Sequence, residues 1–138
     1  MRLTLSWLAM SLTLTACGRQ AAPDCGADAT RYQVLDKFLT KYVAHSEADS
    51  LPKDSLRAMG ITLSKAGGEL SVTKDNFTRR LYLNEVRPAS VDKQIGKYSC
   101  LATVRVVGPS DSMSVHLRYT SELADEGKTH LVTISPAN

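Results

Sequence analysis

The sequence predicts an α+β fold in which an N-terminal amphipathic helix packs on a C-terminal antiparallel sheet. Apolar residues recur at the spacing of an amphipathic helix within residues 30–44. Later in the chain, apolar residues alternate with polar ones over 97–107 and 113–119, which is the pattern of half-buried strands. We therefore expect a two-layer domain in which the helix covers one face of a meander.

The helix over 30–44 is predicted from apolar residues at positions i, i+3, i+4 and i+7, which are Leu35, Phe38, Leu39 and Tyr42. Thr30 and Gln33 have the spacing of a capping box at its start. Asp24 and Asp28 are alternative caps for a helix that begins earlier. A shorter helical turn is expected over 50–59, because Pro52 suits its start and Gly60 follows its end.

Strands are expected where β-branched residues lie between turn signals. These segments are 61–64, 69–73, 80–87, 97–107, 113–119 and 129–135. Residues 88–96 are expected to be a connection, and 108–111 and 124–127 are expected to be turns. The strand over 97–107 alternates most clearly, with one apolar face made of Tyr98, Cys100, Ala102, Val104 and Val106.

The first 16 residues are interpreted as an export signal that is removed, and not as part of the fold. The positive start Met1-Arg2 precedes an apolar run from Leu3 to Leu14. This run is shorter than the roughly 20 residues that a membrane-spanning helix needs. The sequence L-T-A-C then ends at Cys17. Residues 1–17 resemble the signal peptide and lipobox of bacterial lipoproteins.

This resemblance implies cleavage before Cys17 and attachment of lipid, including palmitate-type acyl chains, to this residue. An ordinary signal peptide in which Cys17 is incidental is the alternative. Gly18 stands where an aspartate favours inner-membrane retention in enteric members of the family. The resemblance therefore implies an outer-membrane lipoprotein on the periplasmic face, with 17–24 as a lipidated tether and 25–138 as one periplasmic domain. Several acyl chains anchor a protein durably.

With Cys17 committed to lipid, the two remaining cysteines form an even pair in an oxidising compartment. Cys25 and Cys100 are therefore expected to form one structural disulfide that joins the start of the helix to the sheet. A metal site is the less favoured interpretation, because neither cysteine has further ligands at suitable spacing. A redox-active pair is also less favoured, because the C-x-x-C spacing is absent.

Composition and motifs exclude several functional classes. The chain has 138 residues and a net charge of +3, which suits one domain but lacks the concentrated basic stripe of a nucleic-acid-binding protein. The motifs H-E-x-x-H, G-x-S-x-G and the phosphate-binding loop do not occur. We therefore expect no enzymatic activity, no cofactor, no metal and no nucleic-acid partner.

A candidate binding face is predicted on the side of the sheet that faces away from the helix. His116 and Arg118 share this side of their strand, and Arg105 points the same way on the preceding strand. They are interpreted either as a surface for an anion or an acidic partner, or as an ordinary solvated sheet face. The mature domain is not assigned to a family.

The functional hypothesis is a non-enzymatic, protein-binding module in the periplasm. Such a module would inhibit a toxin or hydrolase as an immunity-type lipoprotein, or serve as an accessory subunit of an envelope complex. The alternative is a small-ligand-binding domain with an NTF2-like or cystatin-like pocket, which rests on analogy of fold alone. This alternative requires a sizeable apolar cavity between the helix and the strands.

Overall fold

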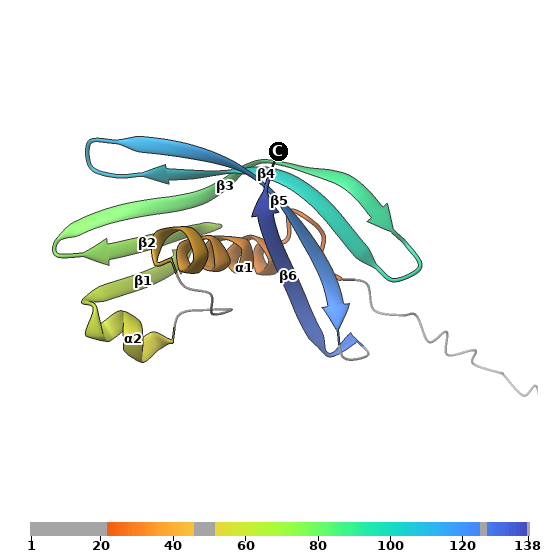
Figure 1. Cartoon of the computed structure of the whole chain (residues 1–138), viewed down its shortest axis with the longest axis horizontal. Coiled ribbons are helices and arrows are strands. Elements are labelled where there is room, and N and C mark those ends of the chain that lie inside the picture. The colour runs from red at the N-terminus through yellow and green to blue at the C-terminus, as the bar shows by residue number, and fades with distance from the viewer. Residues whose placement is uncertain (1–21, 46–51, 125–126, 138) are drawn as a thin grey trace, which may run out of the picture.

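The computed structural model describes residues 22–45, 52–124 and 127–137 (Figure 1). The predicted signal peptide and Cys17 lie outside the described residues. The helical elements are α1 (Asp28–Phe38), its π-helical continuation η1 (Leu39–Val43) and α2 (Lys53–Ala58). The strands are β1 (Ile61–Ala66), β2 (Glu69–Lys74), β3 (Phe77–Asp92), β4 (Lys97–Val107), β5 (Ser112–Ala124) and β6 (Thr129–Pro136).

The six strands form a single antiparallel sheet in which each strand pairs with the next one along the chain, in the order β1 to β6. Strands make up more than half of the described residues. The sheet curls strongly, and α1 lies in the hollow of the curl (Figure 1).

The predicted two-layer α+β architecture is therefore wrong. The helix contacts β2, β3 and β6. In a flat sheet β2 and β6 would be about 19 Å apart, at about 4.8 Å per strand, and a helix about 10–12 Å wide would not reach both. Curling brings both within reach, so the fold is mainly one curled six-stranded sheet with a short helix at residues 28–42 inside it.

The strand predictions succeed where alternation is regular and fail where β3 is irregular. β4 has the predicted bounds, 97–107. β3 continues through the predicted connection as far as Asp92 and places Pro88 opposite Cys100. Its register with β4 shifts twice, between Asn84 and Arg87 and again after Pro88. Proline is tolerated at such an irregularity, because no regular ladder bond requires its missing N–H. These bulges also bend the sheet.

The helix begins without the predicted capping box. Its N-cap is Ala27, and no side chain caps the first turn. Thr30 lies buried in the first turn, and its hydroxyl has no hydrogen-bond partner among the described residues. The preceding chain is held instead by Arg31, whose guanidinium donates to the carbonyl oxygens of Gly26 at 2.9 Å and Leu83 at 3.2 Å. The capping box is absent because the helix begins at Asp28, which places Thr30 inside the first turn rather than at the cap.

The shorter helix is close to its prediction. α2 begins after Pro52, and Gly60 follows it with a φ of +69°. Glycine adopts this left-handed conformation at little cost, which allows the chain to turn directly into β1.

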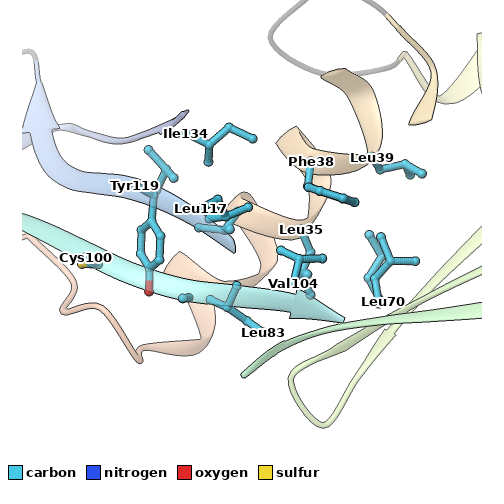
Figure 2. Packing of buried hydrophobic residues seen from close by; sticks show 14 of the residues in the cluster. Leu35, Phe38, Leu39, Leu70, Leu83, Cys100, Val104, Leu117, Tyr119 and Ile134 are labelled. Atoms are coloured by element: carbon cyan, nitrogen blue, oxygen red, sulfur yellow. The ribbon is translucent and has the colours of Figure 1, made fainter. Parts of the chain in front are cut away.

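The core lies between the helix and the inner face of the sheet (Figure 2). Leu35 and Phe38 of the helix are at most 1% exposed and pack against apolar side chains from the strands. The buried strand residues include Leu70, Leu81, Leu83, Val104, Leu117, Tyr119, Val132 and Ile134. The burial of Cys100, Ala102, Val104 and Val106 along β4 confirms the apolar face predicted for this strand.

A short segment before the helix, residues 22–27, is fastened to the sheet; we call it the N-terminal strap. The predicted disulfide between Cys25 and Cys100 is present, with the two Cα atoms 5.9 Å apart. The Tyr119 hydroxyl donates to the Cys25 carbonyl at 2.7 Å. Burial raises the pKa of Tyr119 to about 12, which keeps this donor protonated. The strap thereby fixes the start of the helix on β4 and β5.

Candidate functional site

The three residues of the predicted binding face lie on the exposed, outer side of the curled sheet. Arg105, His116 and Arg118 are all exposed. In the register of β4 and β5, His116 lies opposite Thr103, and Arg118 lies opposite Leu101. Because residues two apart along a strand face the same side, His116 is flanked by Arg118 on its own strand and by Arg105 across the pair.

A bulge in β3 adds an acidic residue that sequence reasoning did not assign to this face. Leu81 and Leu83 point into the core, so strict alternation would turn Glu85 inward as well. The register shift between Asn84 and Arg87 removes this constraint. Glu85 has a φ of +53°, which is unfavourable for a residue with a Cβ. The bulge therefore places a carboxylate on the outer face at the cost of backbone strain.

Glu85, Thr103 and His116 form a chain of hydrogen bonds. The Thr103 hydroxyl donates to Glu85 Oε2 at 2.8 Å and lies 2.9 Å from His116 Nδ1. Its single hydrogen is used on the carboxylate, so the Thr103 oxygen accepts from Nδ1–H. Thr103 is only 7% exposed, whereas His116 is exposed. The chain thus holds the imidazole in one orientation, with Nε2 left for a ligand.

A hollow of about 510 Å³ lies over this hydrogen-bond chain. Arg87 and Arg118 line it together with Glu85, Thr103 and His116, while Arg105 lies outside it. We call Arg87, Arg105, His116 and Arg118 the outer basic face. The three guanidinium groups have no ion-pair partner in the part of the chain that the structure describes. They can therefore attract and bind an anionic group.

A second hollow opens on the inner side of the sheet, where the helix ends. Its volume is about 490 Å³. It is lined by Phe38, Leu39, Tyr42, Val72, Arg79, Leu81, Val106, Met113 and Val115. Arg79 is the one charged residue of this lining. An apolar cavity between the helix and the strands, which the small-ligand alternative requires, is therefore present; we call it the inner pocket.

A second polar cluster, centred on His130, joins the N-terminal strap to β5 and the helix. The Ser121 hydroxyl donates to the Pro23 carbonyl at 2.6 Å. Ser121 therefore accepts from His130 Nε2–H at 2.7 Å, and His130 Nδ1 accepts from the Gln33 amide at 3.0 Å. One ring nitrogen therefore donates a hydrogen bond and the other accepts one, as in a neutral imidazole. Burial lowers the pKa of His130 from its usual 6.5.

Acid should therefore destabilise the fold through His130. Below pH 6.5 the histidine of the unfolded chain takes up a proton, whereas the folded His130 resists it. The unfolded state then binds more protons, so the free energy of unfolding falls as the pH drops toward the lowered folded pKa. Chemical unfolding at a series of pH values between about 7.5 and 5 should show a shallower loss for His130→Gln than for the wild type. Parallel curves would contradict this role.

Two further observations concern the described residues. Within residues 22–45, 52–124 and 127–137, no group of three or more His, Cys, Asp or Glu side chains is arranged to hold a metal ion. None of the helices in these ranges is both long and apolar enough to cross a membrane.

Sequence reasoning missed Glu85, Thr103 and Arg87 as members of the outer site. A signal for this bulge is present in the sequence: the apolar residues of β3 change from odd positions, Leu81 and Leu83, to an even position, Val86, which packs against the core. Comparisons with protein-family models, with curated proteins and with solved structures find no match to this chain.

Proposed function

We propose that this chain is a lipid-anchored protein of the bacterial envelope that binds an acidic segment of a partner protein through the outer basic face. The observation that carries this proposal is the orientation of His116 by Thr103 and Glu85 among unpaired arginines. A group held in place before binding loses less entropy when a ligand arrives. The positive φ of Glu85 costs on the order of 1–3 kcal/mol, and the bulge that imposes it both bends the sheet and turns this carboxylate toward Thr103.

The charges of this face favour an acidic partner. Arg87, Arg105 and Arg118 outnumber the one carboxylate among them, and Glu85 already accepts a hydrogen bond from Thr103. Complementary charge speeds the encounter of two proteins and disfavours partners of the wrong sign. The binding would need no chemical step, which agrees with an inhibitor of the immunity type or with an accessory subunit of an envelope complex.

The proposed anchor would hold the domain close to the membrane. Four residues lie between Cys17 and Ala22, the first described residue of the strap, so the two are five residue steps apart. At about 3.5 Å per extended residue, this length allows about 18 Å between the lipidated residue and the domain. A partner would therefore be a periplasmic protein, or a membrane protein with an acidic segment near the periplasmic face of the outer membrane.

Cross-linking and capture from cell envelopes tests this function. A tagged full chain should retain a specific protein, and Arg118→Glu should reduce its recovery by about tenfold, because a charge at the site is reversed. Arg57→Glu makes the same change of charge on α2, away from the sheet face, and should leave recovery unchanged. Equal recovery with both variants, or no specific protein with the wild type, would refute the proposal.

A further inference from the structure

The inner pocket exists because the curled sheet extends beyond the end of the helix. The helical segment ends with η1 at Val43, and the described residues cover the inner face beyond it only in part. Figure 2 shows Phe38 and Leu39 at the end of the core remote from Cys100. The pocket begins at these two side chains and opens toward the ends of β2, β3 and β5. The disulfide and the strap thus close one end of the curl, and among the described residues nothing closes the other end.

The apolar lining continues outward past the pocket. Met113 is 50% exposed at the rim, and Phe77, which faces the same side of β3 as Leu81, is 64% exposed. Deeper in, Val72 and Val115 form the walls. Large apolar side chains left this exposed next to an open cavity are typical of a binding site for an apolar group.

Arg79, the one charged residue in the lining of this pocket, forms only a weak ion pair. The Arg79 guanidinium lies 3.8 Å from the Asp111 carboxylate, and the two side chains are 53% and 63% exposed. An exposed ion pair at this distance is weak and exchanges readily for another anion. A ligand carboxylate could therefore take the place of Asp111 and form the two-pronged contact that arginine favours.

We propose that the inner pocket binds a single-chain anionic amphiphile of the fatty-acid class. The alkyl chain lies among Phe38, Val72 and Val115, and the carboxylate pairs with Arg79. A volume of about 490 Å³ equals about 16 water molecules at about 30 Å³ each, which is room for one alkyl chain but not for a folded segment of protein. This site faces the inside of the curl, so it is independent of the outer basic face.

Titration calorimetry on the full chain carrying Cys17→Ser, without detergent, tests the proposal. The probes are dodecanoate and dodecyltrimethylammonium, which have the same chain length and opposite charge, each below its micellar concentration. Dodecanoate should bind at least about tenfold more tightly. Shortening its chain should weaken binding by about fourfold for each methylene lost from the pocket.

Two substitutions of the ion pair should act in opposite directions. Arg79→Gln should remove the preference for dodecanoate, whereas Asp111→Asn should tighten dodecanoate binding by about two- to fivefold, because it releases Arg79. Val115→Trp should fill the pocket and abolish binding of both probes. If that variant does not fold, Met113→Glu at the exposed rim should weaken dodecanoate and spare the cationic probe.

Several outcomes would overturn the proposal. These are equal affinity for the two probes, effects of the same sign for Arg79→Gln and Asp111→Asn, and no binding of dodecanoate. If dodecanoate fails to bind while Arg118→Glu still lowers capture of a partner, the amphiphile site is wrong and the outer basic face stands. The reverse result would refute the outer face alone.

Discussion

Replacing Cys25 or Cys100 with serine should lower the free energy of unfolding by about 4 kcal/mol. The bond closes a loop with a sequence separation of 75 residues, so its loss frees a large number of conformations in the unfolded chain. It also releases the N-terminal strap, which is then held by hydrogen bonds from Tyr119, Ser121 and Arg31. The measurement is urea unfolding of each variant in a chain that also carries Cys17→Ser. This substitution removes the proposed site of lipid attachment and leaves Cys25 and Cys100 unchanged.

The double variant Cys25→Ser/Cys100→Ser is the matched control. A single shared bond predicts that the double variant loses about as much stability as either single variant. Thiol counting on the denatured Cys17→Ser chain should find no free thiol. A double variant that loses the sum of the two single effects would contradict one shared bridge.

The second large effect is expected from Leu35→Ala, which should cost about 2–5 kcal/mol. Leu35 is 0% exposed and lies between the helix and the inner face of the sheet. The curl surrounds this position, so neighbouring strands have little freedom to collapse into the cavity, and the cost should lie toward the upper end of the range.

Lys41→Ala is a control on the exposed side of the same helical segment and should change stability by at most about 0.5 kcal/mol. Thermal and urea unfolding should give the same ranking of the two variants. A loss below about 1 kcal/mol for Leu35→Ala would contradict a helix enclosed by the sheet.

Local patterns along the chain predicted the elements better than they predicted the architecture. Alternation over 97–107 located β4, because its inner side chains pack on the core and its outer ones meet water. The curl depends on bulges in β3, and the alternation of apolar residues does not give the direction or the degree of the bend that these bulges produce. The predicted capping box is wrong because the helix begins earlier, at Asp28, so Thr30 lies inside its first turn.

In the candidate site, too, some features follow from local sequence patterns and others depend on tertiary structure. The exposed positions of Arg105, His116 and Arg118 follow from strand alternation, and the structure places them on one face. The Glu85 contact required the bulge and its positive φ, which a regular alternation along β3 does not predict. The inner pocket also depends on tertiary structure, because it forms only where the curled sheet extends past the helix.

Photocross-linking in the intact cell envelope tests most directly whether a partner docks on the outer basic face. A photoreactive residue at Ser114, which lies opposite Arg105 on the exposed side of β5, should form a discrete adduct with one protein. The same residue at Ala29, exposed on the helix, should form none. Adducts of equal yield from both positions, or an adduct from position 29 alone, would contradict docking on this face.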